Sequence, residues 1–207
     1  MEVSCTTTFD KVVLIWLLSE WHKLDVPRDR QLIKNPDLTN HAENDERLRL
    51  LRSLRDPIIK YLPKDVSPKW VLIEEADLPN LFIVPSYDWY WPTGGTFRLM
   101  DTAENLGSYR GDHFGAVNAK SDFMRGYDHA ATREVLILVA PSEAGPFTII
   151  DGNHRAINLY LSPDRKSSMP WKGILIDDPL IAYYKWFINS PQARFWLQRW
   201  AAVPPPR

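Results

Sequence analysis

The sequence predicts an α+β fold, in which a small mixed sheet is flanked by helices and preceded by an N-terminal helical annex. Three observations support this prediction. Apolar residues recur every three or four positions in the first third of the chain, short apolar runs fill the middle, and two proline-initiated segments, 179–189 and 191–201, close it. We expect a helical annex over residues 1–68, an α+β core over 69–178, and C-terminal helices over 179–207 packed on that core.

The annex is expected to begin with a helix that runs to about Leu24. Thr8 or Asp10 can cap it, because both side chains accept hydrogen bonds from the first helical N–H groups. The polar segment from Leu24 to Asn40 contains two prolines and is predicted to be a loop. The residues expected to face inward on the helix are Val12, Ile15, Trp16 and Leu18.

A second annex helix, from about Ala42 to Tyr61, interleaves apolar and basic residues. Pro57 should bend or break it, because proline removes a helical hydrogen bond. The arginines could contact phosphates, but a solvated face paired with neighbouring acids is the favoured interpretation. The arginines are Arg47, Arg49, Arg52 and Arg55, and the acids are Glu43, Asp45 and Glu46.

The core is predicted to alternate short strands with helices. The run EVLILVA, residues 134–140, is almost wholly apolar, as expected for a strand that is covered on both faces. The other expected strands are 70–73, 81–84, 97–100, 147–150 and 173–176, and the expected helices are 112–126 and 153–161.

Composition excludes several classes of protein. Lys and Arg total 25 against 26 Asp and Glu, so the net charge of −1 argues against a protein that mainly grips duplex DNA by its phosphates. The single cysteine, Cys5, excludes a disulfide framework and a cysteine-based zinc site. The longest apolar run near the start is far shorter than a bilayer span, so we expect an intracellular, cytoplasmic protein without a membrane segment.

The strongest functional signal is the segment TIIDGNHRAINLYL, residues 148–161. A β-branched strand ends at Asp151, Gly152 permits a sharp turn, and a helix opens at Asn153. The first turn of a helix leaves N–H groups unpaired and carries about half a positive charge, so it attracts anions.

Neighbouring side chains add to this candidate anion site. Arg155 can bind phosphate oxygens in a fork, His154 can donate a hydrogen bond or move a proton, and Asp151 can cap the helix or hold a divalent cation. The alternative is a plain strand-to-helix joint, in which Asp151 is an N-cap and His154 and Arg155 are surface residues.

This strand–DGNHR–helix pattern resembles the signature box of the ParB/sulfiredoxin-like superfamily, whose members include partition proteins, sulfiredoxins, a free-serine kinase and ParB-like nucleases. The resemblance implies a sheet of that type and a nucleotide phosphate site lined by Gly152, Asn153, His154 and Arg155. It also implies that Asp151 lies near the metal or the reacting phosphoryl group.

The chain departs from this pattern in two places. The reactive cysteine of sulfiredoxins is replaced by Asn153, which argues against a sulfinic-acid reductase. Only 52 residues follow Arg155, and they contain neither the second phosphate motif nor the helix-turn-helix of partition proteins. A stand-alone nucleotide-binding domain remains.

Three further segments are weaker candidates. Glu75, or its neighbour Glu74, follows a predicted strand and matches the early acidic base of the kinase-like relatives; an exposed strand-end carboxylate is the default interpretation. Tyr109–Phe114 (YRGDHF) is either a second ligand loop or an ordinary helix start. The aromatic cluster 87–91 could stack a base, pack in the core or form a dimer face.

Three functions follow from these observations. The first is a phosphotransferase or NTPase that binds ATP or CTP with Mg²⁺ near Asp151. The second is a ParB-like nuclease in which Asp151 and His154 act on a phosphodiester and the arginine-rich helix binds the nucleic acid. The third is a non-catalytic module that senses a nucleotide or binds a protein, with the aromatic surface as a homodimer interface.

Overall fold

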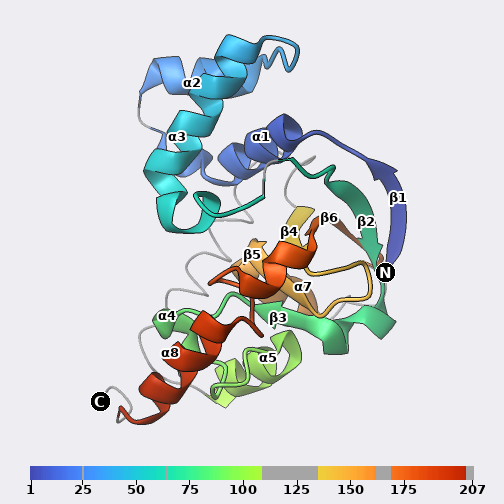
Figure 1. Ribbon diagram of the computed structural model, residues 1–207, viewed down its shortest axis with the longest axis vertical. Coiled ribbons are helices and arrows are strands. Elements are labelled where there is room, and N and C mark those ends of the chain that lie inside the picture. Colours follow the sequence, from blue (N-terminus) through green and yellow to red (C-terminus); the bar gives the residue numbers. More distant parts are fainter. Residues whose placement is uncertain (25, 64, 109–134, 162–168, 204–207) are drawn as a thin grey trace.

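The computed structural model describes residues 1–207 except 25, 64, 109–134, 162–168 and 204–207 (Figure 1). An α+β fold with a six-stranded mixed sheet confirms the predicted fold class. The strand order is β1–β2–β6–β4–β5–β3, and the strands are β1 (Glu2–Thr6), β2 (Lys69–Ile73), β3 (Leu81–Ile83), β4 (Val135–Ala140), β5 (Phe147–Asp151) and β6 (Trp171–Asp177).

The helices lie in two groups around this sheet. In Figure 1 the annex helices are above it, whereas α4, α5 and α8 are below. The described helices are α1 (Phe9–Ser19), α2 (Pro27–Lys34), α3 (His41–Ile59), α4 (Tyr87–Tyr90), α5 (Leu99–Ser108), α7 (Asn153–Leu161) and α8 (Pro191–Ala201), with 3₁₀ turns η1 (Trp21–Lys23), η2 (Glu75–Asn80) and η3 (Pro179–Tyr183).

The central strand β4 determines where the core lies. It pairs in parallel with β6 and antiparallel with β5, and all six of its residues are buried. Helices α1 and α7 both contact it. Because β4 is enclosed in this way, a run of consecutive apolar residues is its stable sequence, as predicted.

Helix α1 is enclosed by protein on every side. The Thr8 hydroxyl caps it by accepting a hydrogen bond from the N–H of Lys11 at 3.2 Å, which confirms the expected start. Six consecutive residues, Val12 to Leu17, are buried, whereas Leu18 is only half-buried. The annex and the sheet therefore share one hydrophobic core.

The segment predicted to be a loop contains helix α2, so that prediction is wrong. Pro27 occupies the first helical position. At this position the missing N–H would have no intrahelical partner, and the fixed φ of proline suits the helix. The proline that suggested a loop therefore starts the helix.

Helix α3 is bent where Pro57 predicted a bend. Arg55, two residues earlier, has a non-helical backbone with φ −139° and ψ 26°. The proline ring cannot tolerate a regular helical carbonyl one turn before it, so the preceding residues leave helical geometry. This bend alters the direction in which the Arg55 side chain projects.

The arginines of α3 do not form a solvated face as a group. Arg47 is fully buried, and its Nε donates to the backbone oxygen of Leu32 at 2.7 Å while its Nη1 donates to Asn44 Oδ1 at 2.5 Å. Its other terminal nitrogen pairs with Glu43. Arg47 therefore joins α2 to α3 and cannot contact a phosphate from outside, which corrects the expectation for this residue.

Three other elements differ from expectation. β1 pairs with β2 in the N-terminal segment, where no strand was predicted. Residues 97–100 do not form a strand: Phe97 has a positive φ of 56°, Arg98 makes one isolated bridge, and α5 begins at Leu99. The helix expected over 179–189 is only the short turn η3.

The remaining predictions for the core have mixed outcomes. β2, β3, β5, β6, α7 and α8 all lie where they were expected. The helix expected over 112–126 lies outside the described residues. Among the helices that are described, none has the length and apolar character that crossing a bilayer requires.

Candidate functional site

The turn between β5 and α7 has the backbone geometry that the sequence predicted. β5 ends at Asp151, Gly152 turns the chain with φ +90°, and α7 begins at Asn153. The Gly152 carbonyl accepts the first helical bond from the Ala156 N–H at 2.8 Å, so Gly152, not Asp151, is the N-cap. The N–H groups of the next three residues have no acceptor within the helix.

Glycine is required at position 152 for two reasons. A φ of +90° is strained for any residue with a side chain. A Cβ atom would also lie 2.8 Å from Leu136 Cδ2 and 3.2 Å from Arg155 Nη1. The turn is therefore tightly packed against β4 and the Arg155 side chain.

Asn153 and His154 are held by the segment that follows β3. The Asn153 Oδ1 accepts a hydrogen bond from the N–H of Val84 at 3.2 Å. The ring of His154 meets Trp89 of α4 edge to face, with centroids 4.8 Å apart. Both residues are half-buried, so they join the turn to β3 and α4 and still reach the surface.

Arg155 folds back over the turn. Its Nη1 donates to the backbone oxygen of Val135 at the start of β4, next to Gly152. Burial raises the pKa of Asp151, and the positive charge of Arg155 offsets part of this rise. For Arg155 to bind a phosphate, the guanidinium must exchange the Val135 carbonyl for a phosphate oxygen.

Asp151 faces the annex. The carboxyl group is buried, and its Oδ2 accepts a hydrogen bond from the Ser19 hydroxyl at the end of α1, at 3.0 Å. Burial raises the pKa of Asp151; the nearby Arg155 and Arg55 oppose this shift, and the negative charge of Glu20 adds to it. Asp151 is therefore a carboxyl group with a perturbed pKa, and such groups are common at functional sites.

Glu20 forms the centre of a buried ion pair beside Asp151. Its side chain is 2% exposed, and Arg55 Nε donates to its Oε1 at 2.6 Å while Lys23 pairs with Oε2. Burial opposes ionisation, but Arg55 and Lys23 together hold the pKa of Glu20 below its usual value. Arg55 is thus engaged by Glu20, and the arginine patch expected on this helix is further reduced.

Ser19 and Glu20 were not identified as site residues from the sequence, whereas Arg55 and Trp89 were named only as members of the arginine-rich helix and of the aromatic cluster 87–91. One local signal was present: Glu20 follows the apolar run Val12–Leu18 at a position where the helix still faces the core. Ser19 and Asp151 are 132 residues apart, so no local pattern could have paired them.

Glu75 is separated from the turn in the sheet. It is exposed at the start of η2, directly after β2. The strand directions place the ends of β2 and β5 at the same edge of the sheet, but β6 and β4 lie between them. The other weak candidate, Tyr109–Phe114, lies outside the described residues. Among the residues that are described, no three His, Cys, Asp or Glu side chains gather as a metal site.

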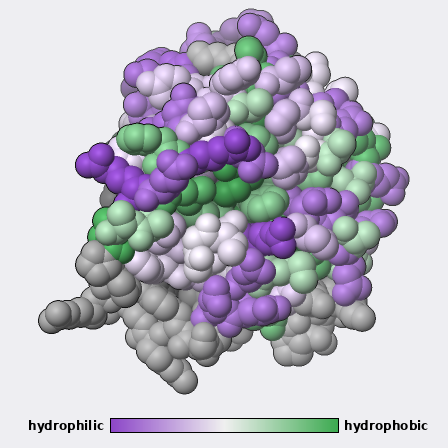
Figure 2. All heavy atoms as spheres, turned by 60° about the horizontal axis from the view of Figure 1, so that its bottom comes forward, coloured by the Kyte–Doolittle hydropathy of each residue, from purple (hydrophilic) through white to green (hydrophobic). Residues whose placement is uncertain are grey.

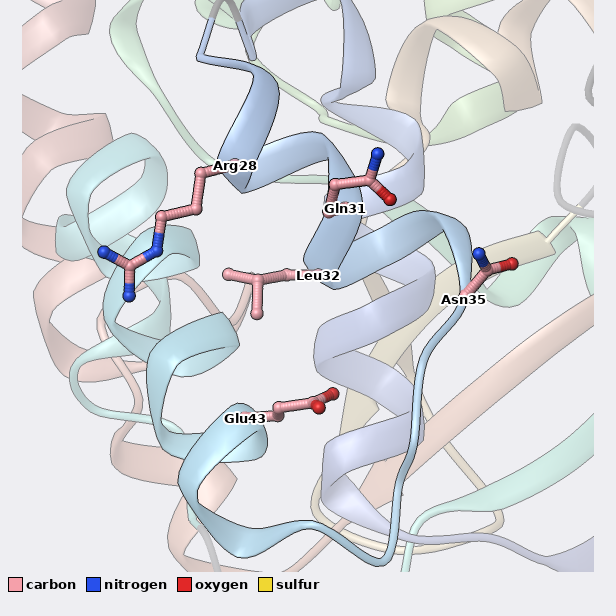
Figure 3. A pocket seen from close by; sticks show the side chains of 5 residues that line it. All are labelled: Arg28, Gln31, Leu32, Asn35 and Glu43. Carbon is pink, nitrogen blue, oxygen red and sulfur yellow. The ribbon is translucent and has the colours of Figure 1, made fainter.

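A shallow hollow lies in the annex, between α2 and the start of α3 (Figure 3). Its charged groups already have partners: Arg28 pairs with Glu46 at 2.6 Å, and Glu43 pairs with Arg47. It is therefore a gap between paired helices without a free charge for a ligand. The lining residues are Arg28, Gln31, Leu32, Asn35 and Glu43.

Comparisons of the chain with protein-family models, with curated proteins and with solved structures give no match. Its function must therefore be inferred from the site itself.

Proposed function

We propose that the chain binds a nucleoside triphosphate, ATP or CTP, at the turn between β5 and α7, and hydrolyses it or transfers its terminal phosphoryl group. We also propose that its sheet is of the ParB/sulfiredoxin type, on the basis of the strand–DGNHR–helix resemblance. The main support for the proposal is the β5–α7 turn. There the partly exposed first turn of α7 follows Gly152, whose positive φ would strain any other residue.

The chemistry of this turn suits a phosphate tail. The N–H groups of Asn153, His154 and Arg155 lie in the first turn of α7, where anions are stabilised. The Arg155 guanidinium now donates to a neutral carbonyl oxygen, and its hydrogen bond to a negatively charged phosphate oxygen would be the stronger of the two. His154 can donate a further hydrogen bond.

The proposed companion of the nucleotide is a magnesium ion held mainly by phosphate oxygens and water, because the one carboxylate at the turn, Asp151, is buried and bonded to Ser19. Nucleotide-bound Mg²⁺ usually takes one or two protein carboxylates and fills its other positions with phosphate oxygens and water. Asp151 is the carboxylate at the turn, and Ser19 fixes its orientation. The ion would neutralise negative charge on the phosphates during transfer.

The test is calorimetric titration of the purified chain with ATP, CTP and GTP, with and without Mg²⁺. We expect binding of at least one nucleotide, and a loss of at least tenfold in affinity for Arg155→Ala, because a charged hydrogen bond to phosphate is removed. Arg49→Ala, on the exposed side of α3, is the matched control and should bind normally. Flat titrations of the wild type with all three nucleotides would refute the proposal.

A further inference from the structure

Helix α8 presents an exposed face that is both aromatic and basic. Gln192, Phe195, Trp196 and Arg199 follow one another at spacings of three, one and three residues, so they share one side of the helix, and all four are exposed. The opposite side packs inward through Ala193 and Leu197. Figure 2 turns towards the reader the end of the molecule that carries α8.

The rings of this face continue onto α4. Phe195 meets Trp196 with centroids 5.3 Å apart, and Trp196 stacks on Trp200 at 6.3 Å with 20° between the planes. Trp200 in turn meets the edge of Tyr87 at 5.9 Å, and Tyr87 is 45% exposed. These four residues form an aromatic track, in which Phe195, Trp196 and Tyr87 are exposed and Trp200 is half-buried against the core.

The exposed charges of α8 are positive, and the one acidic residue of α4, Asp88, adjoins Tyr87 at the other end of the track. Arg194 and Arg199 are exposed on α8, and the helix contains no acidic residue. Within the described part of the chain, neither arginine forms an ion pair. The whole chain has a net charge of −1, so this positive charge is a local feature and favours an anionic partner.

Two other occupants fit these observations less well. A second copy docked through this face would bring the same arginines together across a two-fold axis, and like charges repel. A membrane-surface helix needs a broad apolar face turned outward. On α8 the aliphatic residues face inward, and the outward rings are flanked by glutamine and arginine.

We propose that the aromatic track and Arg199, with Arg194 exposed on the adjoining side of α8, form a binding surface for single-stranded nucleic acid. Unpaired bases stack on exposed rings whatever their sequence, and the guanidinium groups neutralise the phosphates between them. Helix α4 carries both Tyr87, which touches Trp200, and Trp89, which touches His154. A strand bound on the track therefore lies one short helix away from the β5–α7 turn.

Fluorescence anisotropy with labelled dT15 and U15 tests this inference. The wild type should bind both, with log K falling against log salt at a slope of about −1.4 for two phosphate contacts on a single strand. Trp196→Ala should weaken binding by about 5- to 150-fold, the range found for one base stack. Arg199→Gln should reduce the magnitude of the slope by about 0.7.

Matched controls separate this surface from other causes. Tyr61→Ala removes an exposed ring from the annex, 58% exposed against 42% for Trp196, and should leave oligonucleotide binding unchanged. Arg155→Ala should retain oligonucleotide binding, so a failure of the nucleotide proposal stays distinct from a failure of this one. Absence of oligonucleotide binding by the wild type overturns the inference, as does equal binding by Trp196→Ala. Anionic vesicle binding or dimerisation that Trp196→Ala abolishes, without any oligonucleotide binding, would identify the other occupants instead.

Discussion

Removal of the Arg55 side chain tests the buried charges that connect the annex to the turn. Arg55→Met keeps most of the alkyl stem but leaves the Glu20 carboxylate, 2% exposed, without its main counter-charge. Breaking a buried pair from one side costs about 3–5 kcal/mol. Lys23, which is 39% exposed, still contacts Glu20 in this variant. We therefore expect the free energy of unfolding to fall by about 3 kcal/mol, near the lower limit of this range.

Urea unfolding measures this loss. For a chain of this size the dependence on urea is about 3 kcal/mol per M, so the midpoint should fall by about 1 M with an unchanged slope. In the wild type the pKa of Glu20 is lowered, so the stability from the pair is present above its usual value and is lost as the pH falls through the lowered pKa. The deficit of Arg55→Met should therefore shrink as the pH falls from the usual pKa of a glutamate through the lowered pKa of Glu20.

The double variant Glu20→Gln/Arg55→Met is the decisive control. It removes the orphaned charge, so its stability should return to within about 1 kcal/mol of the wild type. If the double variant is as unstable as Arg55→Met, the loss comes from the packing of the arginine stem, and the electrostatic reasoning is refuted.

Two further substitutions probe the turn. Burial raises the pKa of Asp151, so the stability that this group contributes is complete below its usual pKa and is lost as the pH rises through the raised value. Asp151→Asn should therefore be more stable than the wild type at pH 8, by about 1 kcal/mol or more, with the difference vanishing near pH 3; a pH-independent difference in urea unfolding contradicts this. Gly152→Ala should lose about 2 kcal/mol, because φ is +90° and the Cβ meets Leu136, which lowers the melting temperature by about 4–8 °C. An unchanged melting temperature in calorimetry would show that the backbone relaxes at no cost.

The elements that the sequence predicted well have local signals. β4 is a continuous apolar run, and only a strand covered on both faces accepts such a run at that length. The β5–α7 joint is marked by Asp-Gly, and α8 by Pro191 after Ser190, which caps it. In each case the deciding residues lie within a few positions of one another.

The elements that were missed depend on partners far along the chain. β1 is a fully exposed edge strand whose only specification is its pairing with β2. Arg47 can be buried because the backbone oxygens of Leu32 in α2 and Asp37 in the following loop accept its hydrogen bonds, and the sequence of α3 does not indicate these partners. The same holds for the candidate site: the turn could be recognised from its motif, but the contact of Ser19 with Asp151 requires the folded chain.

The hydrogen bond from Ser19 to Asp151 crosses the boundary expected at residue 68 and connects the end of α1 to the end of β5. A fragment that starts at Lys69 would lose β1, which pairs with the outer edge of β2. It would also lose Ser19 and expose the buried Asp151 carboxyl group to water. Once it is solvated, the Asp151 carboxyl group would lose the rise in pKa that burial causes. The annex thus helps to bury Asp151 at the β5–α7 turn and to keep the pKa of this residue raised.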